Sequence, residues 1–112
     1  MTHADTDNLE VSIADLSDAR DQGAYVLDVR RDDEYTEAHV PGAVHIALDQ
    51  LADRWGEVPK DQRVYVICAS GNRSMVAAKA LAEAGIDAVS VAGGTKAWLA
   101  DGRPAATGTT PG

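Results

Sequence analysis

The stretch that decides the fold reads Arg63-Val64-Tyr65-Val66-Ile67-Cys68-Ala69-Ser70-Gly71-Asn72-Arg73-Ser74. Val64 to Ile67 form a continuous apolar run, which is typical of a strand buried on both faces of a parallel sheet. The small residues after Cys68 predict a tight loop, and an alanine-rich helix begins near Arg73. A sulfur in this place faces backbone N–H groups and the positive end of a helix, and both favour a thiolate.

Strand and helix patterns alternate on both sides of this stretch. The expected strands are residues 11–13, 25–30, 43–46, 64–67 and 88–92, and the expected helices are 14–22, 32–37, 49–55, about 73–84 and 95–100. This alternation predicts an α/β protein with a mainly parallel sheet. Residues 1–8 and 105–112 are polar or rich in Gly, Thr and Pro, so we expect flexible ends around one domain at 9–104.

Composition narrows the function classes. A chain of 112 residues with a net charge of −8 fits one domain and disfavours nucleic acid, which binds basic faces. No apolar run reaches the ~20 residues of a membrane span, and the first residues lack a signal-peptide pattern. One cysteine cannot form an internal disulfide, so we expect a reducing, cytoplasmic setting. The three histidines are scattered, and we expect no metal site.

Cys68 and Asp28 are the candidate functional residues. A free cysteine is often only a small buried hydrophobe, but a purely structural role needs neither the small-residue loop nor Arg73. Sites in open α/β sheets form where strands end, and the second expected strand ends at Asp28 and Arg30 as the fourth ends at Cys68. Because Asp28 interrupts an apolar run, we expect it to be partly buried and paired with Arg30 or Arg73.

Several motifs in order resemble the single-domain rhodanese family of sulfurtransferases. They are Leu27-Asp28-Val29-Arg30, Glu34, His39-Val40-Pro41-Gly42-Ala43, the Cys68 loop, and Gly93-Gly94 with Ala97-Trp98. The resemblance implies a three-layer α/β/α fold with a five-stranded parallel sheet in the order 3-2-4-5-1. In that order Asp28 and Arg30 would lie beside the Cys68 loop. It also raises the expectation that Glu34 pairs with an arginine.

The resemblance implies covalent sulfur transfer without metal or cofactor. Cys68 would take sulfane sulfur from thiosulfate or a persulfide and pass it to cyanide, a thiol or a protein acceptor. The loop that would hold this sulfur comprises Ala69, Ser70, Gly71, Asn72, Arg73 and Ser74. Family members often carry arginine where this chain has Ala69, and Ser70 and Asn72 are neutral as well. A persulfide donor is therefore as plausible here as thiosulfate.

Two alternatives remain open. Tyrosine phosphatases on a related fold need five residues between cysteine and arginine, whereas only four separate Cys68 from Arg73. The shorter loop would make a ring of N–H groups suited to one sulfur atom and too tight for phosphate. The second alternative is a sulfur-carrier or interaction module that serves a dedicated protein partner, with little free turnover. Cys68 argues against an inactive module but does not distinguish a carrier from an enzyme.

Overall fold

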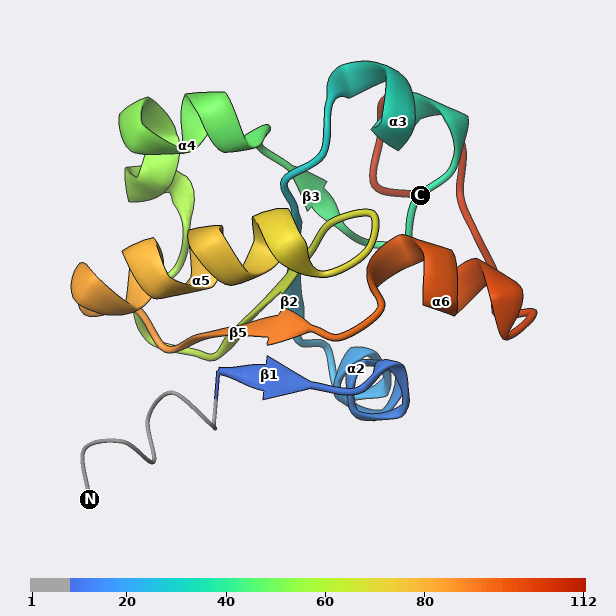
Figure 1. Cartoon of the computed structure of the whole chain (residues 1–112), viewed down its shortest axis with the longest axis horizontal. Coiled ribbons are helices and arrows are strands. Elements are labelled where there is room, and N and C mark those ends of the chain that lie inside the picture. Colours follow the sequence, from blue (N-terminus) through green and yellow to red (C-terminus); the bar gives the residue numbers. More distant parts are fainter. Residues whose placement is uncertain (1–8) are drawn as a thin grey trace.

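The computed structural model describes residues 9–112, and the expected flexible segment 1–8 lies outside the described residues. The elements follow the predicted alternation (Figure 1). They are β1 (Glu10–Val11), α2 (Ile13–Asp21), β2 (Tyr25–Asp28), α3 (Asp32–Glu37), β3 (Val44–His45), α4 (Leu48–Arg54), the 3-10 turn η1 (Trp55–Glu57), β4 (Val64–Ile67), α5 (Asn72–Glu83), β5 (Ala88–Val91) and α6 (Gly94–Ala100).

The five strands form one parallel sheet in the order β1-β5-β4-β2-β3. This is the predicted order 3-2-4-5-1 counted from the opposite edge, so the predicted topology is confirmed. In the centre of the sheet, Asp28 at the end of β2 pairs in register with Ile67 at the end of β4. The two polar strand ends identified in the sequence are therefore neighbours.

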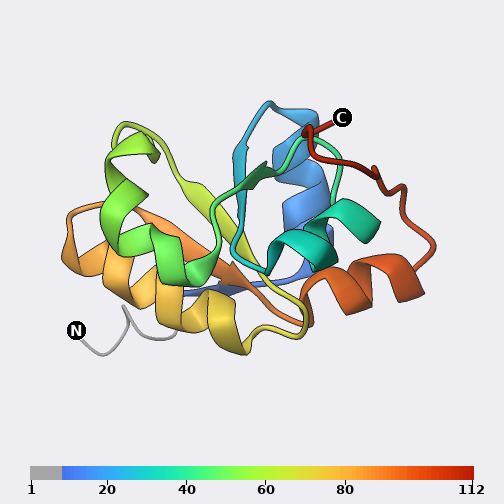
Figure 2. The same ribbon diagram turned by 90° about the horizontal axis from the view of Figure 1, so that it is seen from above.

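Helices cover both faces of the sheet and give the expected three layers. One core cluster joins the sheet to α4 and α5 through Leu51, Ala77 and Leu81. The other contains Leu16 of α2 and Trp98 of α6, together with Tyr35 of α3. Figure 2 shows the same separation, with α4 and α5 on one side of the sheet and α2, α3 and α6 on the other.

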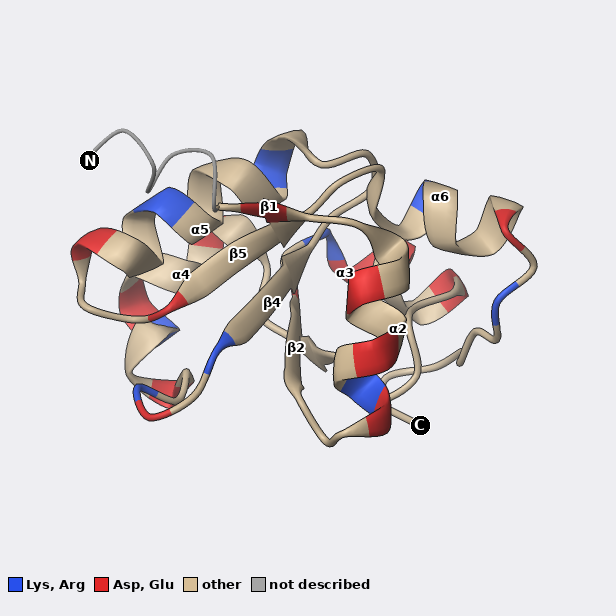
Figure 3. Ribbon diagram, turned by 90° about the horizontal axis from the view of Figure 1, so that it is seen from below, with Lys and Arg blue, Asp and Glu red and all other residues tan. Residues whose placement is uncertain are grey.

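The first strand is shorter than predicted because a helix cap cuts it off. The Ser12 hydroxyl accepts a hydrogen bond from the Asp15 backbone N–H, and the Asp15 carboxylate accepts one from the Ser12 N–H. This reciprocal capping box satisfies two N–H groups at the start of α2. Residues 12 and 13, predicted as strand, therefore serve as the cap and first residue of α2. Acidic residues continue along α2 and recur on α3, as the red segments of Figure 3 show.

The C-terminal segment, which its composition predicts to be flexible, forms specific hydrogen bonds. His39 and Ala106 exchange two backbone hydrogen bonds of 2.9 and 2.8 Å. The His39 ring is fully buried, and its Nε2 lies 3.0 and 3.1 Å from the carbonyl oxygens of Thr110 and Pro111. The ring also stacks on Tyr35 of α3, with centroids 3.7 Å apart. Residues 105–112 are thus joined to α3 and the turn after it, which composition alone did not indicate.

Candidate active site

The Cys68 loop turns tightly between β4 and α5 because Gly71 adopts a backbone conformation that suits glycine. Its φ is +108°, and it caps the N-terminus of α5. In this conformation the Gly71 N–H points back and donates to the Cys68 Sγ at 3.1 Å. Ala69 and Ser70 lie in the turn, whereas Asn72, Arg73 and Ser74 begin α5. The predicted loop residues are therefore gathered around the start of one helix.

The surroundings of Cys68 have features of both interpretations that the sequence left open, a buried apolar residue and a stabilised thiolate. Only 1% of the residue is exposed, and it belongs to the apolar cluster that includes Val29 and Ala77. Its sulfur nevertheless has polar neighbours, because Sγ lies 3.3 Å from the Ser74 hydroxyl oxygen in addition to the Gly71 N–H. The sulfur is a buried core atom at which several hydrogen-bond donors converge.

Burial raises the pKa of the Cys68 thiol, but the surrounding donors outweigh this effect. The Ser74 hydroxyl and the backbone N–H groups of Ser74, Gly71 and Ser70 all stabilise the thiolate, and the pKa lies below its ordinary value. A lowered pKa increases the fraction of thiolate, which is the nucleophilic form. The lowered pKa of Cys68 has the direction that the sequence predicted, and neutral hydrogen-bond donors cause it.

Arg73, the cation expected to stabilise the sulfur, is held by a carboxylate. Its two terminal nitrogens donate to the two oxygens of Glu34 at 2.9 and 3.1 Å. The Arg73 guanidinium lowers the pKa of Glu34 to about 2, and Glu34 in turn raises the pKa of Arg73. The expected pairing of Glu34 with an arginine is confirmed. Its consequence is that much of the positive charge beside the sulfur is neutralised.

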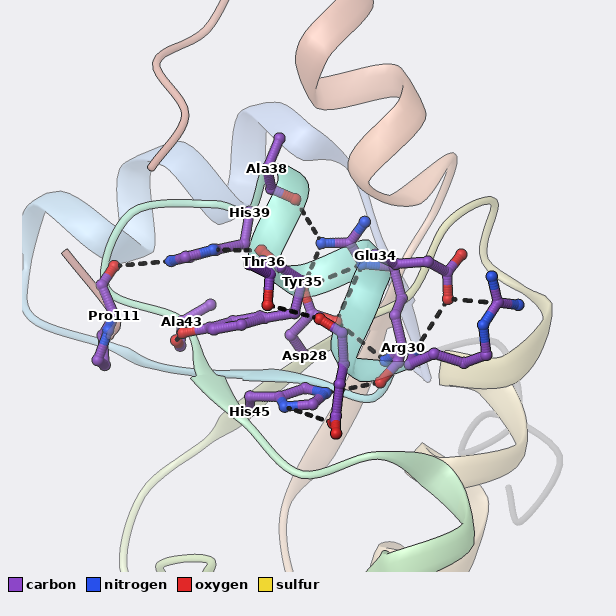
Figure 4. A network of polar contacts seen from close by, with 12 residues as sticks. Asp28, Arg30, Glu34, Tyr35, Thr36, Ala38, His39, Ala43, His45 and Pro111 are labelled. Carbon is purple, nitrogen blue, oxygen red and sulfur yellow. Dashed lines mark hydrogen bonds and ion pairs between the residues drawn. The ribbon is translucent and has the colours of Figure 1, made fainter. Parts of the chain in front are cut away.

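Asp28 and Arg30 form a second, more deeply buried pair at the end of β2. Asp28 is fully buried and Arg30 is 6% exposed. The Arg30 guanidinium donates to both Asp28 oxygens at 2.9–3.1 Å, and its other bond goes to the Ala38 carbonyl (Figure 4). Of the two partners expected for Asp28, the structure selects Arg30. The Val29 N–H donates to the Ile67 carbonyl, which fixes this pair beside the residue that precedes Cys68.

The third arginine of this region is also paired. Arg31 donates to Asp33 at 3.1 and 3.2 Å on the exposed side of α3. Arg30, Arg31 and Arg73 line one side of a cleft of about 390 Å³, whose other residues include Leu48 and Asp49. Each of the three arginines around this cleft therefore faces a carboxylate within the described part of the chain.

Gly94 lets α6 approach the Cys68 loop at backbone contact. A Cβ atom at this position would collide with the Cys68 carbonyl oxygen and lie 2.7 Å from the Ala69 carbonyl carbon. The first turn of α6 donates backbone hydrogen bonds to the carbonyls of Cys68 and Ala69, at 2.8 and 3.0 Å. The Gly93-Gly94 motif thus allows the first turn of α6 to hold the backbone of the Cys68 loop by hydrogen bonds.

Ser90 is a site residue that the sequence reasoning missed. It is fully buried on β5, and its hydroxyl oxygen lies 2.7 Å from that of Ser74. A signal was available, because Ser90 is the single polar residue in the otherwise apolar strand Ala88–Val91. The same kind of interruption drew attention to Asp28.

Comparisons with known proteins agree with this geometry. The model of the rhodanese-like domain family matches residues 12–101. YtwF of Bacillus subtilis strain 168, provisionally named a sulfurtransferase, is 38% identical over 97 residues, which cover 85% of this chain and 94% of YtwF. The thiosulfate sulfurtransferase GlpE of Pseudomonas syringae pv. syringae strain B728a is 38% identical over 80 residues, or 70% of this chain and 76% of GlpE.

A solved structure also matches the fold. The rhodanese-related protein TVG0868615 of Thermoplasma volcanium has a TM-score of 0.82 and 32% sequence identity, and the match covers 87% of this chain and 96% of that one. The fold and the Cys68 loop define a rhodanese-type α/β domain. The chain belongs to the rhodanese-like domain family, and its relatives YtwF and GlpE bear sulfurtransferase names. Within residues 9–112, the helices are too short or too polar to cross a bilayer.

Proposed function

We propose that this protein transfers sulfane sulfur through a persulfide on Cys68. The observation that supports this most is the convergence of neutral donors on a buried sulfur, which lowers the pKa of the thiol. A thiolate is the form that attacks a sulfane sulfur. The same N–H groups would stabilise the negative charge of the persulfide, as an oxyanion hole stabilises an oxygen anion. Cytoplasmic location suits this chemistry because a reducing setting keeps the thiol free.

The proposed reaction consists of two displacements. In the first, the Cys68 thiolate attacks the outer sulfur of thiosulfate, the S–S bond of the donor breaks, and sulfite leaves with the bonding electrons. With a persulfide donor, a thiolate leaves instead. In the second, cyanide or a thiolate attacks the outer sulfur of the enzyme persulfide, giving thiocyanate or a new persulfide and returning the Cys68 thiolate.

Burial of the sulfur limits what can reach it. Because Cys68 is 1% exposed, we propose that the loop 69–73 shifts outward to admit the donor sulfur. The Arg73–Glu34 pair joins this loop to α3, and Arg73 also lines the cleft of about 390 Å³. A donor whose outer sulfur is at the end of an unbranched group would reach the buried Cys68 sulfur more easily than a bulky donor.

Charge pairing favours a persulfide over thiosulfate as donor. Thiosulfate is a dianion, and its capture benefits from unpaired cations at the mouth of a site. Arg30, Arg31 and Arg73 are paired with carboxylates, and the other side chains of the loop are neutral. The GlpE relative's name supports thiosulfate as a donor. We therefore propose that both kinds of donor react and that cysteine persulfide, which carries less net negative charge than thiosulfate, gives the larger kcat/KM.

Intact-protein mass spectrometry tests the persulfide directly. Incubation with thiosulfate or cysteine persulfide should add one sulfur atom, and cyanide should remove it as thiocyanate. Cys68→Ser should lose the adduct and all transfer while it keeps the wild-type unfolding midpoint. Full activity in Cys68→Ser would contradict the proposal. A sulfur adduct without turnover on small acceptors would instead support the carrier alternative, in which a dedicated protein takes the sulfur.

The phosphatase alternative is tested with the same two proteins. The loop with four residues between Cys68 and Arg73 should not hydrolyse p-nitrophenyl phosphate. Hydrolysis by the wild type that disappears in Cys68→Ser would show that the loop accommodates phosphate, and it would replace sulfur transfer as the assignment.

A further inference from the structure

One sulfur and two hydroxyl groups, those of Cys68, Ser74 and Ser90, form a continuous buried chain of contacts. The Cys68 Sγ lies 3.3 Å from the Ser74 Oγ, which lies 2.7 Å from the Ser90 Oγ. Ser74 and Ser90 are both fully buried. The Ser90 hydroxyl has a second, longer contact of 3.5 Å with the Gly71 carbonyl oxygen. Among the described residues, Ser90 thus joins the sulfur site to the central sheet without touching the sulfur.

We propose that Ser90 is a positioning residue that aims the Ser74 hydroxyl at the Cys68 sulfur. A role of Ser90 in catalysis rests on the proposed function, but its effect on the ionisation of the Cys68 thiol does not. Ser90 is held by β5, which pairs with β1 and β4 on its two sides. A rigid strand therefore fixes the group that orients Ser74.

The direction of the hydrogen bonds explains what Ser90 contributes. In the thiol form, Cys68 donates to Ser74, Ser74 donates to Ser90, and Ser90 donates over the long contact to the Gly71 carbonyl. When the thiol gives its proton to a solvent base, the sulfur becomes an acceptor. Ser74 then donates to the sulfur, and Ser90 turns to donate to Ser74. The chain reverses with the loss of one proton; S–H is the only covalent bond broken, and Ser90 gives up its long contact with the Gly71 carbonyl.

The reversed chain is the stronger one. A hydrogen bond to an ionised sulfur is about twice as strong as a neutral one, and a donor behind it polarises Ser74 and strengthens it further. In the thiol form Ser90 offers only a neutral acceptor, and its own donor contact is long. Loss of the Ser90 hydroxyl should therefore destabilise the thiolate more than the thiol and raise the pKa of Cys68.

The pH dependence of Cys68 alkylation by iodoacetamide tests the inference on the full chain. In Ser90→Ala the inflection should move to higher pH, and the rate below the inflection should fall about three- to tenfold. Ser90→Thr keeps the hydroxyl and should restore the wild-type profile. Because alkylation needs no sulfur donor, this result stands even if the proposed sulfur transfer fails.

Thr95→Val is the matched control. Thr95 is also buried, at 2% exposure, but its hydroxyl has no hydrogen-bond partner among the described residues. Removing that hydroxyl should leave the alkylation profile unchanged. An unchanged profile in Ser90→Ala, or an equal change in Thr95→Val, would overturn the inference. If the added methyl group prevents Ser90→Thr from folding, the comparison of Ser90→Ala with Thr95→Val still decides.

Discussion

The ends of β2 and β4 lie side by side, yet they handle charge in opposite ways. At the end of β4, neutral N–H and O–H groups surround a sulfur that gains stability as an anion. At the end of β2, full charges are buried and cancel one another in the Asp28–Arg30 pair. The Arg73–Glu34 pair joins the two regions. Oriented dipoles thus lower the pKa of the Cys68 thiol, whereas the nearby cations are paired with carboxylates.

The largest expected effect comes from breaking the buried pair at β2. Asp28→Ala leaves the Arg30 guanidinium buried at 6% exposure without its carboxylate, which should lower the free energy of unfolding by about 3–5 kcal/mol. Urea denaturation measures this change. The control is Asp33→Ala, which breaks the exposed Arg31–Asp33 pair and should leave the unfolding midpoint close to wild type. Equal effects of the two substitutions would show that burial does not distinguish these pairs.

Much of this fold is predictable from sequence because buried parallel strands have a strong pattern. β4 begins and ends where the apolar run predicts, at Val64 and Ile67. The boundaries of β1 were less accurate because the capping box at Ser12 competes with strand propensity. The bonds of the C-terminal segment were not foreseen, because on its side they use backbone groups, which leave no pattern in the sequence.

Those parts of the candidate site that consist of neighbouring residues in the sequence were predictable, whereas contacts between distant segments were less so. The loop from Cys68 to Ser74 is contiguous, so its gathering around one helix start follows from sequence. The partner of Asp28 remained open between two arginines, since spacing cannot decide which guanidinium reaches a buried carboxylate. Ser90 lies 16 residues from Ser74, and its contact depends on the packing of β5 against α5. Such contacts between distant segments need the three-dimensional arrangement.

The next effect tests whether the loop depends on close backbone support. Gly94→Ala places a Cβ against the Cys68 and Ala69 backbone and should cost about 2–4 kcal/mol of stability. It should also slow Cys68 alkylation, because the collision displaces the loop. Gly85→Ala is the matched control: its φ of +90° imposes similar backbone strain, but a Cβ there meets nothing within 4 Å. Gly85→Ala should cost about 1–2 kcal/mol and leave alkylation unchanged. If both variants alkylate at the wild-type rate, the loop does not need this support.

The smallest effect concerns the pair that joins the two regions. Glu34→Gln releases Arg73 from its carboxylate and should raise kcat/KM for thiosulfate about two- to fivefold relative to cysteine persulfide, which carries less negative charge, with a gain that shrinks at high salt. Glu37→Gln removes the same charge from α3 at an exposed position and serves as control. Equal gains in the two variants would trace the effect to net charge rather than to Arg73.

The same substitution has a defined pH signature in stability. Arg73 lowers the pKa of Glu34 from its ordinary 4.5 to about 2 in the folded protein. Because the folded pKa is the lower one, the carboxylate contributes its stability, about 1 kcal/mol, in full above pH 4.5 and loses it as the pH falls through about 2. The unfolding free energies of wild type and Glu34→Gln should therefore differ at pH 6 and converge near pH 2. A difference that persists unchanged at pH 2 would mean that the contribution of Glu34 does not depend on its charge.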